Sequence, residues 1–281
     1  MDRGDTRTPT RQRARWIGRG AALSAVALSL SACDTYDLPR LGMPTSATEQ
    51  GDRIIRLWQG SWIAAFIVGG LVLGLLVWAM IAYRKRDEEM PVQTRYNIPI
   101  ELFYTAVPVV IIGVLFFFTA RDETKLTSIK GHADERINVV GYRWSWTFNY
   151  LDQNTYDIGT PAQLPTLWVP VDHTVRFVLT SPDVIHDFWV PAFIEKRDII
   201  PGRTNTFDLT MTRTGTFRGK CAELCGTYHG RMLFDVRVVT QADYDAHMKA
   251  LRDLGQVGAV NGKIETDATD KQGRTDIGGN P

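Results

Sequence analysis

Two long uncharged stretches dominate the hydrophobic pattern of this chain. The first covers residues 57–83, and the second runs from Leu102 to Ala120. A helix needs about 20 apolar residues to cross the hydrocarbon core of a bilayer. Tryptophan and tyrosine side chains lie toward the ends of the first stretch, as is typical of membrane–water interfaces. The pattern therefore predicts a hairpin of two transmembrane helices at 57–83 and 98–120.

The loop between these stretches, residues 84–97, is basic. Its cationic side chains are Arg84, Lys85, Arg86 and Arg95. Because cytoplasmic loops carry an excess of lysine and arginine, we expect this loop on the cytoplasmic side. The segment 33–56 and all residues after Ala120 are then external.

The N-terminus has the pattern of a secretory signal. Six arginines in the first 20 residues precede an apolar run at 21–30 that is too short to span a bilayer. The run ends in LSAC, and small residues before a cysteine resemble the lipobox of bacterial lipoproteins. We predict a lipoprotein-type signal peptide at 1–32, lipidation of Cys33 and an external N-terminus. Plain cleavage with an incidental cysteine is the alternative.

Beyond residue 131 the pattern changes to short alternating segments. These are rich in Val, Ile, Thr, Phe and Trp and are separated by Pro, Gly, Asp and Asn. Such spacing is typical of an all-β sandwich or barrel, which we predict for 131–240. A short helix at 241–254 and a polar, disordered tail at 255–281 follow. The predicted fold is thus a membrane α hairpin plus an external all-β domain.

Composition adds one feature. The net charge of +1 points to neither a nucleic acid nor any other strongly charged partner. The chain has three cysteines, and two of them lie in the segment 221–232, CAELCGTYHGRM. In an oxidising compartment two such cysteines first suggest a disulfide. A disulfide, however, gives no reason for His229 and Met232 to follow at similar short steps.

The donor types in this segment favour a soft metal ion. Thiolate, imidazole and thioether ligands suit copper better than magnesium or calcium, and zinc has little use for methionine. A mononuclear blue-copper site needs one cysteine, two histidines and a methionine. The extra cysteine allows a binuclear site if a second histidine comes from elsewhere, and His186 in VIHDFWVP is our candidate. We expect His132, His173 and His247 to be structural. Spacing alone leaves disulfide, zinc and single copper open.

The larger pattern resembles a known family. CxExCGxxHxxM, preceded by DVIHxxxVPxxxxKxDxxPG and by a two-helix hairpin, resembles subunit II of cytochrome c oxidase from bacterial aa3-type haem–copper oxidases. The resemblance covers roughly residues 55–240. It implies a cupredoxin-like domain with a binuclear Cu(A) centre of two copper ions. The implied ligands are the bridging thiolates of Cys221 and Cys225, the imidazoles of His186 and His229, the sulfur of Met232 and the backbone carbonyl of Glu223.

The resemblance also implies a function. A subunit II takes electrons from cytochrome c at Cu(A) and passes them to haem in subunit I, where oxygen is reduced to water and protons are pumped. Trp144 in YRWSW would receive the electrons, although Arg143 and Ser145 replace residues usual in the family. The Glu223 side chain would bind magnesium or manganese shared with subunit I. Glu101 would mark the cytoplasmic entrance of a proton path.

Partners and location follow from the same resemblance. We expect subunit I, other oxidase subunits, membrane lipid, and a cytochrome c that is soluble or held in a supercomplex with a bc-type complex. The expected location is the bacterial plasma membrane, with the copper domain outside. A cluster of acids near His186 could attract a basic cytochrome. Its members are Asp183, Asp187, Glu195 and Asp198.

Three rival classes fit less well. A quinol oxidase subunit II has the same outline but lacks the copper ligands. A membrane-tethered copper chaperone predicts one anchor and a thioredoxin-like α/β pattern. A soluble nitrous oxide reductase carries Cu(A) but is longer and has no hairpin.

Overall fold

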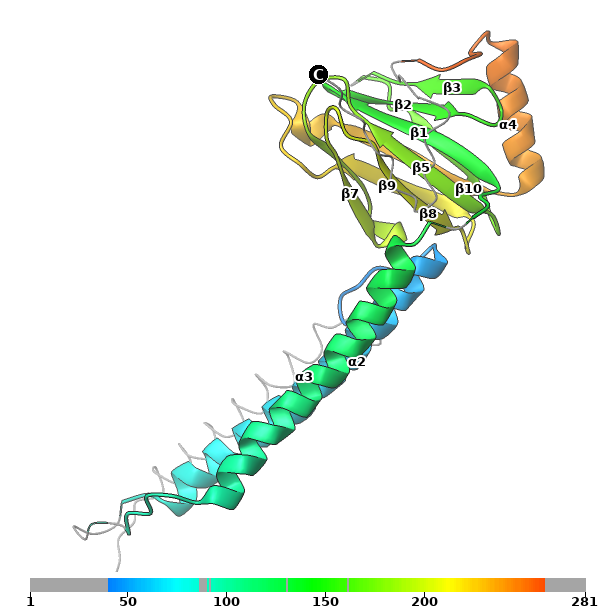
Figure 1. The fold of residues 1–281 in the computed structure, drawn as a ribbon. Coiled ribbons are helices and arrows are strands. Elements are labelled where there is room, and N and C mark those ends of the chain that lie inside the picture. Colours follow the sequence, from blue (N-terminus) through cyan, green and yellow to red (C-terminus); the bar gives the residue numbers. More distant parts are fainter. Residues whose placement is uncertain (1–39, 86–89, 91, 130, 161, 261–281) are drawn as a thin grey trace, which may run out of the picture. The chain divides into compact units, whose positions relative to one another are not determined.

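The computed structural model describes residues 40–85, 90, 92–129, 131–160 and 162–260 (Figure 1). The predicted signal peptide and Cys33 lie outside the described residues. The chain divides into two compact units, 1–44 and 45–281, and every helix and strand named below belongs to the second.

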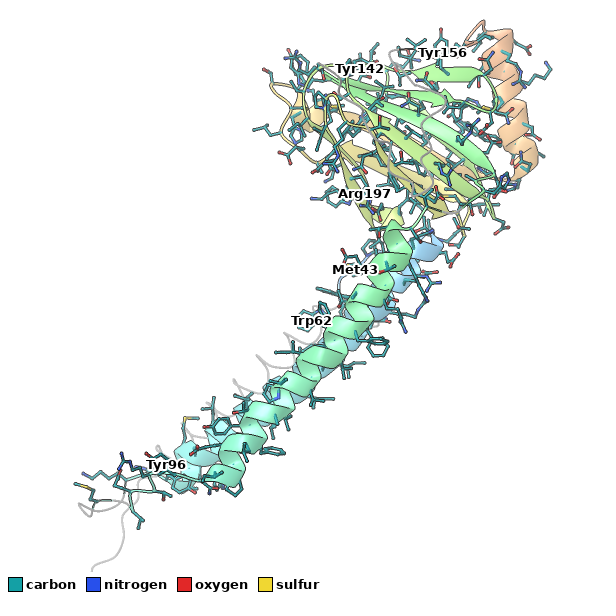
Figure 2. The ribbon with its side chains drawn as sticks, viewed as in Figure 1. Met43, Trp62, Tyr96, Tyr142, Tyr156 and Arg197 are labelled. Atoms are coloured by element: carbon teal, nitrogen blue, oxygen red, sulfur yellow. The ribbon has the colours of Figure 1, made fainter. Side chains whose placement is uncertain are left out.

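Two long helices form the predicted hairpin. They are α2 (Glu49–Ala82) and α3 (Ile98–Thr127), which contact each other and are both long and apolar enough to cross a membrane. Their apolar side chains point outward, as Trp62 does in Figure 2. Helix α2 begins eight residues before the predicted span, and α3 continues seven residues beyond Ala120.

The early start of α2 has a clear physical cause. Thr48 caps the helix by accepting a hydrogen bond from the Gly51 backbone N–H, and its hydroxyl donates to the Phe193 carbonyl at 3.0 Å. The Gln50 side-chain oxygen accepts from the Thr210 backbone N–H at 3.0 Å. The polar first turns, which sequence placed in the external segment 33–56, are therefore held by the β domain.

The β domain consists of two five-stranded sheets (Figure 1). The first has the order β3 (Thr155–Ile158), β2 (Ser145–Tyr150), β1 (Glu135–Tyr142), β5 (Thr174–Thr180), β8 (Asn205–Thr210). The second has the order β4 (Thr166–Pro170), β10 (Leu233–Val239), β9 (Gly215–Cys221), β6 (His186–Val190), β7 (Glu195–Ile199). The β1–β5 and β4–β10 pairs are parallel and the others antiparallel. The predicted all-β, cupredoxin-like domain is confirmed.

Aromatic rings fill the space between the sheets. Phe188 of β6 stacks on Phe234 of β10 at 5.2 Å between ring centroids, and Trp146 of β2 meets Phe234 edge-on at 4.9 Å. All three side chains are fully buried. Large rings of this kind contribute much of the hydrophobic stabilisation of a small domain. They also fix the ends of β6 and β9, from which His186 and Cys221 extend.

The C-terminal part of the domain differs from expectation. Helix α4 (Gln241–Asp253) matches the predicted helix. The segment after it is not disordered up to residue 260, because Val257 pairs with Thr155 of β3 and Val260 exchanges two hydrogen bonds with the Asn149 side chain. The predicted tail was therefore wrong for 255–260, where an edge strand and a buried amide satisfy the backbone. Later residues lie outside the described part.

Asn149 is the centre of this attachment. Its amide also donates to the Asn138 side chain at 2.9 Å, and both residues are fully buried. Replacing Asn149→Ala should lower the free energy of unfolding by about 1–3 kcal/mol, because buried partners lose their hydrogen bonds. Urea unfolding of the detergent-solubilised protein, followed by tryptophan fluorescence, measures this. Asn205→Ala, which removes one exposed hydrogen bond, is the control and should change little; equal effects would contradict the assignment.

Candidate metal centre

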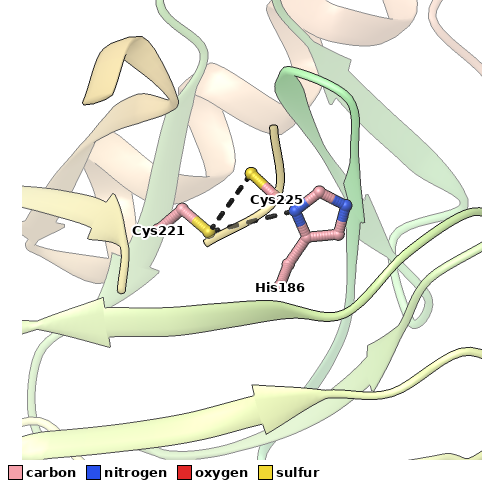
Figure 3. Close-up of side chains that lie close together, drawn as sticks. All are labelled: His186, Cys221 and Cys225. Carbon is pink, nitrogen blue, oxygen red and sulfur yellow. Dashed lines mark hydrogen bonds between the residues drawn. The ribbon is translucent and has the colours of Figure 1, made fainter. Parts of the chain in front are cut away.

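Two cysteines and a histidine converge at one end of the second sheet (Figure 3). Cys221 is the last residue of β9, Cys225 lies in the following loop, and His186 is the first residue of β6. Cys221 Sγ is 3.9 Å from Cys225 Sγ and 3.9 Å from His186 Nδ1. All three residues are buried. Strand pairing causes the convergence, since Phe188 of β6 lies opposite Cys221 of β9.

Three further donors complete the cluster. The chain turns through a short 3₁₀ helix, η3 (His229–Arg231), which brings His229 Nδ1 to 3.6 Å and Met232 Sδ to 3.7 Å from Cys225 Sγ. The Glu223 carbonyl oxygen is 3.2 Å from Cys221 Sγ. Each sulfur thus has its own histidine and one weaker donor. The structure brings together all six groups that the sequence assigned to the metal.

The geometry and chemistry of these groups fit a soft metal ion. The two sulfurs are about twice as far apart as the 2.05 Å of a disulfide bond, and both cysteines are free. Burial, together with the neighbouring Cys221, raises the pKa of the Cys225 thiol. Once its thiols are ionised, the buried pair of sulfurs therefore favours a bound cation. Cysteine, histidine and a fully buried Met232 sulfur are the donor set that copper prefers.

Asp183 supports the histidine ligand. One of its carboxylate oxygens lies 2.9 Å from His186 Nε2, which leaves Nδ1 directed at Cys221. Burial alone would raise the pKa of Asp183, but hydrogen bonds from the Arg143 backbone N–H, the His186 ring and the Val184 backbone N–H lower it to about 2. A carboxylate on the distal ring nitrogen is the usual way to orient a metal-binding histidine. Sequence reasoning missed this role, although the spacing D-x-x-H offered a signal.

The predicted acidic surface is not found as one exposed patch. Asp183 is turned toward His186, and Asp187 is buried. Burial, together with a hydrogen bond to Asp198, raises the pKa of Asp187. Glu195 pairs with Arg197, and only Asp198 is well exposed. The cause lies in the pairing of β6 with β7: Asp187 lies opposite Asp198 and hydrogen-bonds to it, whereas Glu195 alternates to the other face of β7. The expectation of a coherent negative surface near His186 was therefore wrong for Asp187.

Trp144 lies against the metal loop. Its indole N–H donates to the Cys225 carbonyl at 3.2 Å, and its ring meets Tyr228 edge-on at 5.0 Å. Gly226 makes this approach possible, because its φ is +121° and a Cβ there would lie 3.2 Å from the Trp144 ring. Sequence reasoning predicted Trp144 but missed Tyr228 and Gly226. The indole thus joins a ligand-bearing loop to the protein surface.

The apolar surroundings of the cluster come from alternate residues of β6 and β10. Phe188 and Phe234 are fully buried, whereas Trp189 and Leu233 are half-buried because they alternate to the other face of their strands. Trp189 instead stacks under the Lys220 ammonium at 4.4 Å. Trp146, which sequence reasoning did not assign, is a third buried ring beside the cluster: its indole N–H donates to the Met232 carbonyl at 3.4 Å.

The remaining predicted residues lie elsewhere. The Glu223 side chain is exposed, although its carbonyl faces Cys221. Glu101 lies in the first turn of α3 and accepts a hydrogen bond from the Asn97 backbone N–H. The three histidines expected to be structural are not part of the cluster: His132 is exposed, His173 contacts the Val171 carbonyl, and His247 stacks on Trp168.

The fold and the site together define a class of protein: a copper electron-transfer domain of the cupredoxin type attached to a membrane hairpin. Residues 38–120 match the family model described as cytochrome c oxidase subunit II, transmembrane domain, and residues 158–239 match that of the periplasmic domain. The chain is 45% identical to a probable cytochrome c oxidase subunit 2 of Streptomyces avermitilis, over 97% of this chain and 98% of that one.

The chain is also similar to a mycobacterial relative and to one solved domain. Cytochrome c oxidase subunit 2 of Mycobacterium tuberculosis is 32% identical, with 84% of this chain and 81% of that one covered. The crystal structure of the periplasmic domain of subunit II of cytochrome oxidase from Bradyrhizobium japonicum is 32% identical, covers 45% of this chain and 99% of that one, and gives a TM-score of 0.41. The chain belongs to the cytochrome c oxidase subunit II family.

Membership settles several expectations. The protein is a membrane subunit of an oxidoreductase complex that contains other oxidase subunits. The family binds copper as Cu(A) for electron transfer, and His186, Cys221 and Cys225 are positioned as such a site.

Gly226 provides a test of how the loop holds its ligands. Gly226→Ala should lower the copper content per chain, because a side chain there would need a strained positive φ and would press on the Trp144 ring. Metal analysis of the purified protein measures the change. Gly230→Ala in the same loop is the matched control, since its Cβ would meet nothing within 4 Å. Full copper retention in both variants would show that the tight approach is unimportant.

Proposed function

We propose that this chain receives electrons from a ferrocytochrome c on the external side of the membrane and delivers them to the haem of subunit I. The observation that carries the proposal is the convergence of six donor groups, two of which are cysteine sulfurs 3.9 Å apart. The residues that would hold two copper ions are Cys221 and Cys225 as shared thiolates, His186, His229, Met232 and the Glu223 carbonyl.

Bound copper would supply one-electron redox chemistry at this site. The protein's own residues prepare the place for it. The paired strands β6 and β9 fix His186 and Cys221, and Asp183 holds the imidazole orientation through its 2.9 Å hydrogen bond. Phe188, Phe234 and Trp146 exclude water from one side. A site that is already arranged needs little rearrangement when an electron arrives or leaves.

Trp144 is the proposed point of contact with the donor. It is partly exposed and hydrogen-bonded to the carbonyl of Cys225, so it links the surface to a ligand through one contact. The donor would be a soluble cytochrome c or a membrane-bound one in a supercomplex with a bc-type complex. The basic loop 84–97 supports a cytoplasmic hairpin turn and hence an external copper domain.

Two further acids have proposed roles. Glu223 presents its carbonyl to Cys221 and leaves its carboxylate exposed, so one residue can serve copper and also a magnesium or manganese ion shared with subunit I. Glu101, in the first turn of α3 after the basic loop, is the proposed start of a proton path on the cytoplasmic side. The signal peptide 1–32 and lipidation of Cys33 remain predictions from sequence.

Trp144→Phe tests the route of the electron. In the purified oxidase, this variant should be reduced by ferrocytochrome c about tenfold more slowly, equivalent to about 1.4 kcal/mol of activation free energy. The reason is that the indole and its hydrogen bond to Cys225 are lost. Stopped-flow absorbance at the copper centre measures the rate.

Reduction by dithionite, which does not need the docking face, should be unchanged. Trp168→Phe is the control, since Trp168 stacks on His247 of α4 instead of contacting the metal loop. A Trp144→Phe protein that ferrocytochrome c reduces at the parent rate would remove Trp144 from the proposed route.

A further inference from the structure

A cleft of about 510 Å³ opens beside Trp144. Its apolar part is formed by Trp144, Tyr228 and Ile158, and the last two are well exposed. The charged residues among its described lining are Arg143 and Arg231, and no described residue that lines it is acidic. The face proposed to receive electrons thus combines an apolar part with two positive side chains.

The nearby acids do not offset this charge at the surface. Asp183 faces inward to His186 and also accepts hydrogen bonds from the Arg143 backbone and side chain. Its side chain is 20% exposed, against 49% for that of Arg143. Arg231 is exposed and forms no ion pair with any residue that the structure describes. The charge of Arg143 is therefore partly neutralised by Asp183, and Arg231 is available to a partner.

We infer that the electron donor docks in this cleft through carboxylates that surround its haem edge, and not through a basic surface. This rests on the proposed function of Trp144. A guanidinium group pairs well with carboxylates, often through two parallel hydrogen bonds. The apolar part of the cleft suits the exposed edge of a haem, because the centres of protein interfaces are apolar. The positive charge of the cleft is opposite in sign to that of the acidic surface that the sequence suggested.

The charge of the residues that line the cleft acts mainly on the rate at which the donor associates. Opposite charges on two docking faces speed their encounter at low ionic strength, and added salt removes the advantage. The sign of the salt effect therefore reports the sign of the donor face that fits. A donor with carboxylates at its haem edge should lose speed as salt is added, whereas a basic donor should gain.

The test uses the purified oxidase that contains this chain and two forms of one ferrocytochrome c. The native form is basic; in the succinylated form, carboxylates replace the lysine ammonium groups. Stopped-flow reduction at low ionic strength should show that Arg231→Gln slows the succinylated donor, on the order of threefold, and speeds the native one. Comparing variant with parent for each donor cancels differences in the donors' own reactivity.

Two variants guard against damage to the metal loop, because Arg231 lies between His229 and Met232. Arg231→Lys keeps the charge and should restore the parent rates, and Arg231→Gln should keep the parent copper content. Arg252→Gln removes the same charge from α4, outside the cleft, and should leave both rates unchanged.

The inference is overturned if the native basic form is slowed by Arg231→Gln or by added salt, or if Arg252→Gln acts like Arg231→Gln. A different failure marks the proposed function itself. If neither cytochrome reduces the oxidase while dithionite does, the chain does not take electrons from a cytochrome c, and the inference falls with it.

Discussion

The close approach of two buried sulfurs, Cys221 Sγ and Cys225 Sγ at 3.9 Å, governs the design of this protein. Burial and mutual repulsion both oppose ionisation of this pair, so a bound cation would be needed to hold both as thiolates. The rest of the domain serves to hold them there. β9 carries the first sulfur, the loop 222–224 returns the chain to the second, and the rings of Trp146 and Phe234 pack against each other nearby.

Each contact of this cluster with its surroundings has a separate physical role. Asp183 orients the imidazole of His186, and Trp144 links the Cys225 carbonyl to the surface. Glu223 has its carbonyl toward Cys221, whereas its side chain is exposed. These three residues lie on different segments of the chain. The ligands are therefore supported from several directions by residues that are distant in sequence.

Much of this could be predicted from sequence, because the strongest signals are local. Apolar length gave the two membrane helices, and alternation gave the β domain. The short steps from Cys221 to Met232 placed soft donors within one loop. What escaped prediction depends on contacts between distant segments. The start of α2 is fixed by Thr48 contacting Phe193, and the order of 255–260 is fixed by Asn149. Neither contact leaves a mark in composition.

The charge of the face proposed to receive electrons shows the same limit in another form. Acids close in sequence to His186 suggested a negative surface, yet Asp187 is buried opposite Asp198 of β7, and Asp183 hydrogen-bonds the histidine. Arg143 and Arg231 are far apart in sequence, but the fold places both in the lining of one cleft. A surface charge is set by which side chains remain exposed after the interior is satisfied, and only the structure gives that.

Electron paramagnetic resonance of the copper-loaded protein tests the central claim most directly. If Cys221 and Cys225 share two copper ions, the protein should bind two coppers per chain and show a seven-line hyperfine pattern, because one unpaired electron is then shared by two equivalent nuclei. One copper per chain with an ordinary four-line pattern would contradict the account.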